Sequence, residues 1–520
     1  MGDDRLSFET EPSRYRHWKL EVDPPIATLS MAVDPNGGLR DDYELKLNSY
    51  DLGVDIELHD ALQRLRFEHP NVKAVVITGA LDKLFCAGAN IQMLATATHA
   101  HKVAFCKFTN ETRNGMEEMS AEGGQVVIAA VNGTAAGGGY ELALACDEIL
   151  LVDDRSSAVS LPEVPLLAVL PGTGGLTRLV DKRHVRRDLA DVFSTKVEGI
   201  KGKQAVEWGL VDAIAPPTAF VDLVRARALA RAAESDRPDD AEGVELRPLE
   251  HGLVKVERGD GLVTITVQSF STLDTSLEAC RELDDAILDL RFNDPDLGTW
   301  VLQTAGDSAD VVVADRELDR GDWLAREVRL FWKRTLKRLD MSARTLVALV
   351  TPDSCFAGTL AELALAADRT LMLDDDETVL KLTEVNDGWY PMANGISRLA
   401  TRFWGHDETL ACVRSLLGKE LSASDAFDAG LVTSAPDDLD WDDEVRILLE
   451  ERASFSPDAL TAMEANLRFP GPETMETKIF ARLTAWQNWI FQRPNAVGPD
   501  GALKRYGTGL RPTFDKGRVG

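Results

Sequence analysis

The stretch that decides the fold is GTAAGGGYELALACD, residues 133–147. An apolar run, VVIAAV (126–131), precedes it and is typical of a strand, whereas ELALAC (141–146) reads as a buried helix. Three consecutive glycines at a strand-to-helix turn let the backbone approach a ligand closely. The free N–H groups at the helix start favour negative charge. The turn therefore predicts a ligand site, although tight packing of the strand on the helix would also select glycines. No Gly-Lys-Ser/Thr follows, so it is not a phosphate loop.

The same pattern returns 221 residues later in the chain. ELALACD (141–147) reappears as ELALAAD (362–368), and LPEV (161–164) as LTEV (382–385). Asp153-Asp154 matches Asp374-Asp375 at the same offset, and LRF (65–67) matches LRF (290–292) at an offset of 225. Four matches in the same order indicate a duplicated domain. We therefore expect two copies of one fold, a catalytic copy over residues 20–235 and a second copy over 250–520 that includes a C-terminal helical region.

The second copy lacks the glycine-rich turn. Its sequence is Gly358-Thr359-Leu360, and the larger side chains would crowd a ligand. Glu362 and Glu384 persist there, but only VVVADRE (311–317) stands where the first copy has FCAGAN (85–90). We expect the second copy to be a degenerate, structural half.

Composition excludes several classes of protein. The 520-residue chain has 57 Lys and Arg against 86 Asp and Glu, a formal charge of −29, which disfavours a nucleic-acid or anionic-membrane binder. No apolar run reaches the ~20 residues of a membrane span. The first twenty residues lack the apolar core of a signal peptide, and the six cysteines are widely spaced, so we expect reduced thiols in the cytoplasm. No His, Cys and Asp cluster has ligand spacing, and we expect no metal.

Four motifs together resemble the crotonase (enoyl-CoA hydratase/isomerase) superfamily. They are FCAGAN (85–90), AAGGGYELALACD (135–147), LPEVPLL (161–167) and PGTGGLTRLV (171–180). The resemblance covers most of residues 25–235. It implies an α/β fold with a ββα spiral core, here duplicated in one chain, followed by C-terminal helices. It also implies an acyl-CoA substrate, with no cofactor beyond the CoA that the substrate carries.

The resemblance assigns roles to the matching positions. The backbone N–H groups of Ala89 and Gly138 would form an oxyanion hole for the thioester oxygen, flanked by Gly137 and Gly139. Glu141 and Glu163 match two glutamates that handle a water and a proton in the hydratases of the family. A pair of carboxyl groups suits this work because one can stay ionised while the other holds a proton. The sequence leaves open which is acid and which is base.

Further residues are candidates for binding the substrate. Arg40, Lys46 and Lys83 lie near segments that border the CoA groove in the family, and the helical stretch 102–120 brings Phe105 and Cys106 to the acyl pocket. The basic cluster, expected on one helix face by its i, i+4 spacing, comprises Lys182, Arg183, Arg186 and Arg187. Solvated surface charge and an ordinary apolar helix face are the alternatives.

The segment EVPLLAVLP (163–171) is one residue longer than the hydratase pattern. With the chain length, both glutamates, KFTNETRNGMEEMS (107–120) and FETEPSRYRHWKL (8–20), it resembles a ring-opening branch of the superfamily. That likeness implies 2,3-epoxybenzoyl-CoA or its 2,3-dihydrodiol form as substrate, and 3,4-dehydroadipyl-CoA semialdehyde and formate as products. Because a duplicated chain needs fewer subunits than single-copy members of the superfamily, we expect a homodimer. An enoyl-CoA hydratase or isomerase acting on another acyl-CoA, or a non-catalytic interaction module, would share most of these motifs.

Overall fold

The computed structural model describes residues 5–520, which form two compact units. The first unit is Ser7–Pro248, and the second is Leu249–Gly520 together with Arg5 and Leu6. An acidic stretch, residues 233–248, precedes the boundary and has neither helix nor strand. It packs onto the first unit, where the buried guanidinium of Arg237 donates to the carbonyls of Pro70 and Arg66. The division into a catalytic first unit and a structural second unit stays a prediction.

The main sheet of the first unit has the strand order β1-β2-β3-β5-β7-β9. The hairpin β1–β2 is antiparallel, and every later neighbour is parallel. The strands are β1 (Trp18–Asp23), β2 (Ile26–Met31), β3 (Ala74–Gly79), β5 (Val126–Val131), β7 (Glu148–Val152) and β9 (Ala213–Ala215). The apolar run that predicted β5, and the neighbouring strand β3, are buried almost throughout, as central parallel strands require.

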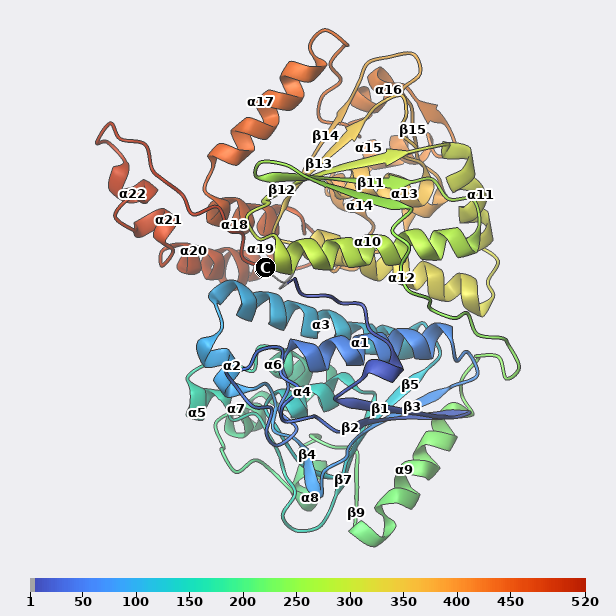
Figure 1. Ribbon diagram of the computed structural model, residues 1–520, viewed down its shortest axis with the longest axis vertical. Coiled ribbons are helices and arrows are strands. Elements are labelled where there is room, and N and C mark those ends of the chain that lie inside the picture. Colours follow the sequence, from blue (N-terminus) through green and yellow to red (C-terminus); the bar gives the residue numbers. More distant parts are fainter. Residues whose placement is uncertain (1–4) are drawn as a thin grey trace. The chain divides into compact units, whose positions relative to one another are not determined.

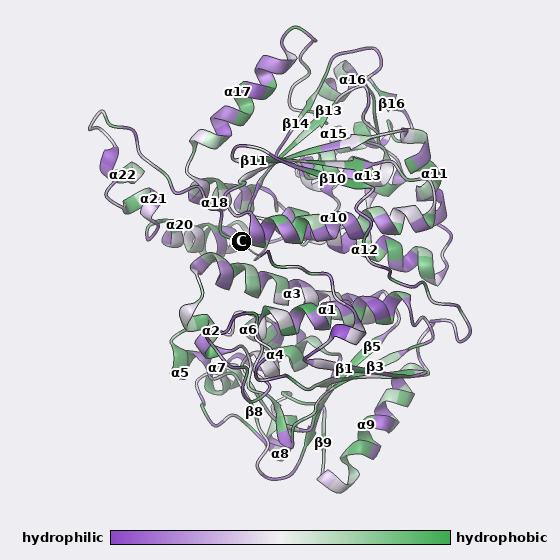
Figure 2. Ribbon diagram, viewed as in Figure 1, coloured by the Kyte–Doolittle hydropathy of each residue, from purple (hydrophilic) through white to green (hydrophobic). Residues whose placement is uncertain are grey.

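Helices cover both faces of this sheet. Helices α1 (Leu52–Phe67) and α3 (His99–Ala121) lie on one face, and α9 (Pro217–Ala232) lies on the other (Figure 1). Helix α1 begins at Asp51, whose carboxylate accepts the N–H groups of Gly53 and Val54 and so satisfies two orphan donors. Helix α9 places Phe220, Ala228 and Ala232 against the sheet, and Figure 2 shows it carrying both hydrophobic and hydrophilic colours.

A smaller parallel sheet carries the glycine-rich turn. It consists of β4 (Lys83–Cys86), β6 (Gly133–Ala136) and β8 (Val159–Ser160), in the order β4-β6-β8. Helix α4 (Gly138–Ala145) follows β6 after one residue, Gly137, with φ +53°. The carboxyl ends of β4 and β6 therefore bring residues 86–90 and 137–138 together. The remaining helical segments of this unit are Pro12–Arg14, α2 (Ile91–Thr96), α5 (Glu163–Leu167), α6 (Gly175–Thr177), a π-helix (Arg178–Lys182), α7 (Arg187–Ser194) and α8 (Gly202–Glu207).

The second unit repeats the main sheet. Its strand order is β10-β11-β12-β13-β14, again an antiparallel hairpin followed by parallel neighbours. The strands are β10 (Val254–Arg258), β11 (Leu262–Gln268), β12 (Thr299–Ala305), β13 (Thr345–Val350) and β14 (Arg369–Met372). Helices α10 (Leu273–Asn293) and α12 (Trp323–Met341) correspond to α1 and α3, and α17 (Trp441–Ser454) packs on the sheet as α9 does. The duplicated α/β fold is thus confirmed.

The second unit departs from the first where the site would be. Residues 311–317 lie in helix α11 (Ser308–Leu318), whereas the first unit has strand β4. The chain then runs from β13 to α13 (Gly358–Ala366) without a counterpart of β6. The other elements are a β15–β16 pair (Leu380–Lys381, Glu420–Leu421), the helical turn Glu384–Asp387, α14 (Arg398–Arg402), α15 (Asp407–Arg414), α16 (Ala423–Asp428), α18 (Pro457–Leu467), α19 (Met475–Thr477), a π-helix (Lys478–Leu483), α20 (Thr484–Ile490), α21 (Pro494–Val497) and α22 (Ala502–Arg505).

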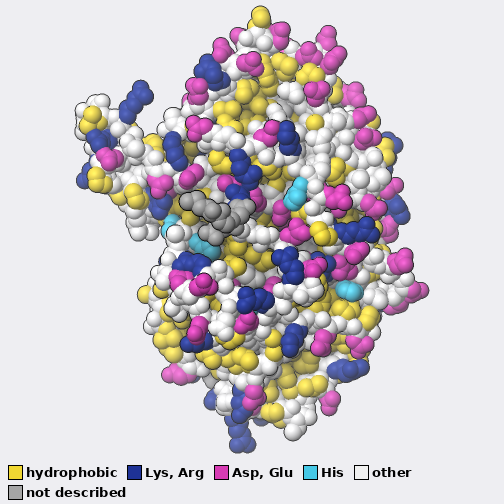
Figure 3. Space-filling view, viewed as in Figure 1, with side chains coloured by type: hydrophobic (Ala, Val, Ile, Leu, Met, Phe, Trp, Pro, Cys, Tyr) yellow, Lys and Arg dark blue, Asp and Glu magenta, His cyan; other side chains and the backbone are white. Residues whose placement is uncertain are grey.

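The surface mixes charges of both signs. On the face drawn in Figure 3, acidic and basic side chains are interspersed, so the excess of acidic residues forms no single patch there. Within residues 5–520 we find no helix that is long and apolar enough to cross a membrane.

Candidate active site

Two backbone N–H groups are left open at the glycine-rich turn. The chain around Ala89 is otherwise paired, because Gly88 accepts from the Tyr50 N–H at 3.1 Å and Asn90 donates to the Tyr50 carbonyl at 2.8 Å. Among the described residues, no acceptor takes the N–H of Ala89 or that of Gly138, the first residue of α4. These are the two positions expected to form the oxyanion hole.

Close packing of backbone holds the two turns together. A Cβ on Gly88, which has φ +91°, would lie 2.8 Å from the Gly138 nitrogen, so only glycine allows this approach. The buried Cys86 thiol fixes the same turn, since it donates to the Asn48 carbonyl at 3.0 Å and accepts from the Gly88 N–H at 3.2 Å. The donors are thus set by a rigid, buried frame, which is what electrostatic stabilisation of a developing charge needs.

Glu141 lies in the first turn of α4 and is 3% exposed. Its Oε1 accepts the N–H groups of Thr173 at 3.0 Å and of Gly175 at 2.8 Å, and its Oε2 accepts the Thr173 hydroxyl at 2.5 Å. The segment PGTGG thus serves as a cradle for this carboxylate. Hydrogen bonds to the charged form stabilise it, and Oε2 keeps a lone pair for a further donor.

Arg113 of α3 links this cradle to the oxyanion turn. Its guanidinium donates to the Tyr50 hydroxyl and to the Gly138 carbonyl, both at 2.9 Å, and to the hydroxyl and carbonyl of Thr173. It also lies 4.0 Å from Glu141 Oε2. Arg113 is 2% exposed, so its charge acts on the site with little screening. No sequence pattern predicted a role for Arg113, Tyr50 or Thr173, and their position after folding reveals one.

Glu163 begins helix α5 and is 8% exposed. A Cβ on Gly137 would lie 2.8 Å from Glu163 Oε1, which places this carboxyl directly over the glycine-rich turn. Its Oε2 is buried and has no hydrogen-bond partner in the described chain. Burial, reinforced by the negative charge of Glu141, raises the pKa of Glu163 to about 7. The two glutamates therefore sit in opposite environments, one cradled by donors and one unpartnered.

The apolar side chains near the site come from two elements. Phe105 of α3 is buried, with its ring centroid 5.9 Å from that of Tyr50. Cys106 is partly buried, and burial raises the pKa of its thiol to about 11. The segment after Glu163 carries exposed apolar residues instead, with Leu166 60% and Leu170 66% exposed. This region, the longer 163–171 segment, forms an apolar surface beside the carboxyl.

Most of the basic candidates are engaged elsewhere. Lys182 donates to the Ala145 carbonyl and pairs with Glu117, both at 2.9 Å, at the end of α4 opposite to Gly138. Arg183 donates to the Gly209 carbonyl and pairs with Asp212. The expected common helix face is wrong, because the π-helix ends at Lys182 and α7 begins only at Arg187. These contacts give Lys182 and Arg183 structural roles.

The remaining cations lie at the surface. Lys46 is exposed and pairs with Glu44 at 2.7 Å, Arg40 pairs with Asp42, and Arg186 pairs with Asp188. Lys83, at the start of β4, is exposed and has φ +56°. Their part in binding CoA stays a prediction.

The corresponding place in the second unit is closed by a side chain. Thr359 stands where the first unit has Gly138, and its N–H donates to Asp315 Oδ2 at 3.0 Å while its hydroxyl donates to Oδ1 at 2.5 Å. Asp315 comes from α11, the helix that replaces β4. Glu362 is bound to Arg398 and Asn386, and Glu384 is exposed. An internal carboxylate therefore takes the N–H that the first unit leaves open.

Comparison with known proteins agrees with this architecture. Residues 44–238 match the enoyl-CoA hydratase/isomerase family. The chain is 54% identical over 543 aligned positions to benzoyl-CoA-dihydrodiol lyase of Aromatoleum evansii, covering 99% of this chain and 98% of the relative. The alpha subunit of the fatty acid oxidation complex of Shewanella loihica is 35% identical over 170 residues, which is 32% of this chain and 23% of that protein.

Among solved structures, an enoyl-CoA hydratase from Geobacillus kaustophilus HTA426 is 32% identical, over 42% of this chain and 75% of that chain, with a TM-score of 0.37. The near full-length match to the Aromatoleum enzyme covers both units. The chain therefore belongs to the benzoyl-CoA-dihydrodiol lyase family, within the crotonase (enoyl-CoA hydratase/isomerase) superfamily.

Proposed function

We propose that this protein is a ring-opening lyase whose substrate is 2,3-epoxybenzoyl-CoA or the corresponding 2,3-dihydrodiol. The epoxide with two waters, or the dihydrodiol with one, gives 3,4-dehydroadipyl-CoA semialdehyde and formic acid, which ionises to formate. The observation that carries the proposal is the pair of glutamates in opposite environments beside two open backbone donors, in a chain whose relative of matching length is a benzoyl-CoA-dihydrodiol lyase.

The oxyanion hole of Ala89 and Gly138 would receive the thioester oxygen. Conjugation carries negative charge from the ring to that oxygen, and two backbone donors in a water-poor site stabilise it as it develops. The start of α4 adds its positive end to the same place. Arg113 stiffens this arrangement, because it holds the Gly138 carbonyl and the cradle of Glu141 at once.

The structure supports an assignment of the two glutamates. Glu163, with a pKa of about 7, is protonated in a large fraction of molecules near neutral pH, so it can donate a proton to the opening epoxide oxygen. Glu141 is held by three hydrogen-bond donors and by Arg113 nearby, and so suits the carboxylate that accepts a proton from water. The different environments of the two carboxyl groups support this proposed pairing of one acid with one base.

The direct test is product analysis by mass spectrometry, with a formate assay, on epoxidised benzoyl-CoA and on its dihydrodiol. We expect the semialdehyde and one formate per turnover. Hydration of crotonyl-CoA at a comparable kcat/KM, without formate from either aromatic substrate, would make the protein an enoyl-CoA hydratase instead. Binding of benzoyl-CoA without turnover of any of these would make it a non-catalytic module.

Three further properties belong to the same proposal. The enzyme is a cytoplasmic homodimer that needs no cofactor beyond the CoA of its substrate. Light scattering of the purified protein should give twice the chain mass of 56.9 kDa. Activity should survive dialysis against EDTA, and cell fractionation should leave the protein with cytoplasmic enzymes. A monomer, or loss of activity that added metal restores, would contradict the corresponding point.

A further inference from the structure

The second unit contains a pocket of about 400 Å³ at the end of α13, which we call the Arg402 pocket. Helices α14, α17 and α18 and the loop after α14 wall it, and its lining includes Arg402, Trp404, His406, Arg452, Met463 and Leu467. Pockets that hold small molecules have volumes of about 300–1,000 Å³ and combine apolar walls with a few polar groups. The Arg402 pocket has both features, and the proposed reaction does not use it.

Arg402 carries a charge that no carboxylate balances. Its Nε donates to the Gly430 carbonyl at 2.9 Å, and within the described chain no Asp or Glu forms an ion pair with it. Burial lowers the pKa of Arg402, with no opposing effect from a nearby anion. A partly buried guanidinium without a counter-ion is held at a cost in desolvation, and an anionic ligand would remove that cost.

The first unit has a carboxylate that pairs with the arginine matching Arg402. Its Arg183 makes the same bond to Gly209, also at 2.9 Å, but adds an ion pair with Asp212 at 2.9 Å. Asp212 also accepts the Ile149 N–H at 2.7 Å, and Thr433 accepts the Thr370 N–H at 3.1 Å in the matching place 221 residues later. The second unit has therefore replaced a carboxylate by a hydroxyl and left Arg402 unpaired.

Arg452 adds a second under-compensated cation. Its Nε is buried without a partner, and its Nη1 is 3.7 Å from Glu464, which also accepts from Thr345 and Arg518. The other lining arginines are fully paired, Arg398 with Asp340 and Arg468 with Asp368. The surplus positive charge thus concentrates on Arg402 and Arg452.

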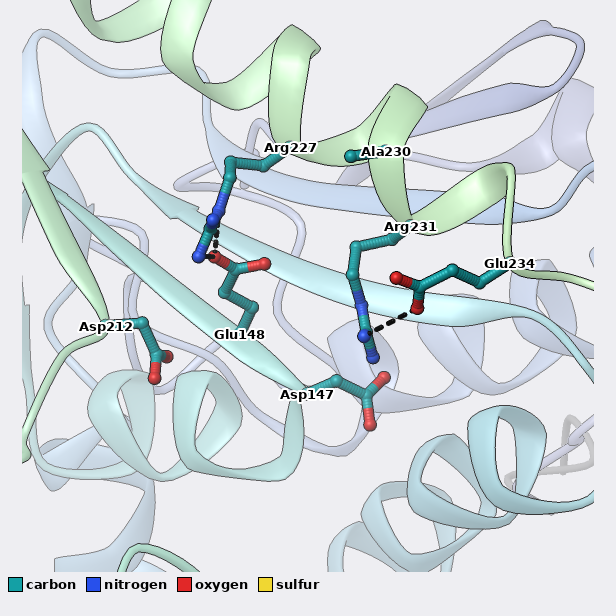
Figure 4. A pocket seen from close by; sticks show the side chains of 7 residues that line it. All are labelled: Asp147, Glu148, Asp212, Arg227, Ala230, Arg231 and Glu234. Carbon is teal, nitrogen blue, oxygen red and sulfur yellow. Dashed lines mark hydrogen bonds and ion pairs between the residues drawn. The ribbon is translucent and has the colours of Figure 1, made fainter.

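The pocket of the first unit at the end of α4 has the opposite character. Figure 4 shows it, about 370 Å³ in volume, with Arg227 paired to Glu148 at 2.5 Å and Arg231 paired to Glu234 at 2.9 Å. Asp147 and Asp212 add two more carboxylates to its lining. Four arginines and two carboxylates, Asp368 and Glu464, line the Arg402 pocket, against two arginines and four carboxylates in the pocket of the first unit. The excess of arginine is therefore a feature of the second unit, in a protein of net charge −29.

We propose that the Arg402 pocket binds a small organic anion, a carboxylate or phosphate group on an apolar body. The charged group meets Arg402 and Arg452, and the apolar body lies against Trp404, Met463 and Leu467. Trp404 is 48% exposed and Leu467 69% exposed, so these walls are open to a ligand. Burying them against an apolar body adds to the affinity.

Calorimetric titration of the full-length protein with benzoate, phenyl phosphate and inorganic phosphate tests the proposal. We expect benzoate or phenyl phosphate to bind in the millimolar range or tighter, and the stronger of the two identifies the charged group. Inorganic phosphate should bind at least about tenfold more weakly than phenyl phosphate. Equal affinity would overturn the role of the apolar wall, and no binding of either aromatic probe would overturn the proposal.

Variants locate the binding. Arg402→Gln should raise the Kd about tenfold or more, whereas Arg446→Gln, which removes an exposed arginine of α17 that is already paired with Asp443, should not. Thr433→Asp keeps every lining residue and restores the counter-ion found in the first unit, so it should also weaken binding about tenfold. Unchanged affinity in both Arg402→Gln and Thr433→Asp would place the probe elsewhere and overturn the proposal. Turnover of the CoA substrate should be unaffected in all three.

Discussion

The two units present the same helix start in two ways. In the first unit, the N–H of Gly138 is open and a carboxyl with an unpartnered oxygen, Glu163, lies over the turn. In the second unit, Asp315 takes the N–H and hydroxyl of Thr359. A helix N-terminus that is not offered to a ligand needs an acceptor from its own chain. The comparison shows that losing a site involved filling it, and not only losing the glycines.

The largest effect is expected at Glu163, a buried carboxyl whose counterpart in the second unit, Glu384, is exposed. Glu163→Gln removes the group that can donate a proton, and kcat should fall by about 10²–10⁴-fold while benzoyl-CoA still binds. Glu141→Gln should do the same, and the double variant should lose far less than the product of the two losses. Steady-state kinetics with calorimetric binding checks this. A Glu163→Gln enzyme with nearly wild-type kcat would remove this residue from the mechanism.

The oxyanion hole comes next. A Cβ at position 138 would lie 2.1 Å from the Tyr50 hydroxyl, so Gly138→Ala must displace Tyr50 and the donor with it. We expect kcat to fall by about 10²–10³-fold, the range for loss of one oxyanion donor, with the circular dichroism spectrum kept. The matched change in the second unit, Thr359→Gly, should alter the rate only a few-fold. Full activity in Gly138→Ala would place the hole elsewhere.

The pH dependence sharpens the assignment of Glu163. If its protonated form is the active one, kcat/KM should be highest below pH 7 and should fall about tenfold per pH unit above it. Glu163→Gln should abolish this dependence at its lower rate. A rate that rises through pH 7 would make Glu163 the base.

Asp315 allows a test of the filled site through stability. Burial raises the pKa of Asp315 to about 7. A raised pKa in the folded state means that protonated Asp315 stabilises the folded protein. This contribution is fully present below the pKa of Asp315 in the unfolded chain, near 3.8, and is lost as the pH rises through about 7. The difference in melting temperature between wild type and Asp315→Asn should therefore shift against the wild type from pH 5 to pH 8. Glu163 titrates in both proteins and cancels. A constant difference would show that Asp315 does not titrate in this range.

The smallest effects are expected from the glutamates of the second unit. Glu384 is exposed, so Glu384→Gln should leave both kcat and melting temperature nearly unchanged. Glu362→Gln should lower the melting temperature, because Arg398 loses a buried partner at 2.9 Å, but should keep kcat within a few-fold. Titration with benzoyl-CoA should give one site per chain. Two sites, one of them lost in Glu362→Gln, would contradict the division of roles.

Local pattern predicted the secondary structure well. The run 126–131 is β5 as predicted, and the helical stretch 102–120 lies within α3. The duplication followed from ELALACD and ELALAAD, which are buried helices in both units and so are constrained by packing. The glycine-rich turn and Glu163 were predicted from motifs, and the structure brings them together.

Other parts of the site depend on contacts between distant segments. Nothing in the sequence pattern of the amphipathic helix α3 marks Arg113 as part of the site. In the fold, Arg113 forms hydrogen bonds with Tyr50, Gly138 and Thr173. The i, i+4 spacing of the basic cluster 182–187 suggested a common helix face, but a π-helix ends at Lys182 and the ion pairs of Lys182 and Arg183 hold both away from the glycine-rich turn. Asp315 could not be predicted, because a sequence with no counterpart to FCAGAN gives no hint that a carboxylate takes its place.

The presence of helix α11 in place of strand β4 has a consequence for any attempt to build a working site in the second unit. A point substitution at Asp315 or Thr359 can empty the filled helix start, but it cannot restore the second donor, because that donor lies on a turn that follows a strand the second unit no longer has. Restoring the second donor would require a new backbone conformation for the segment that forms α11, with the core still folded. The two units thus differ at this place by a segment of backbone as well as by side chains.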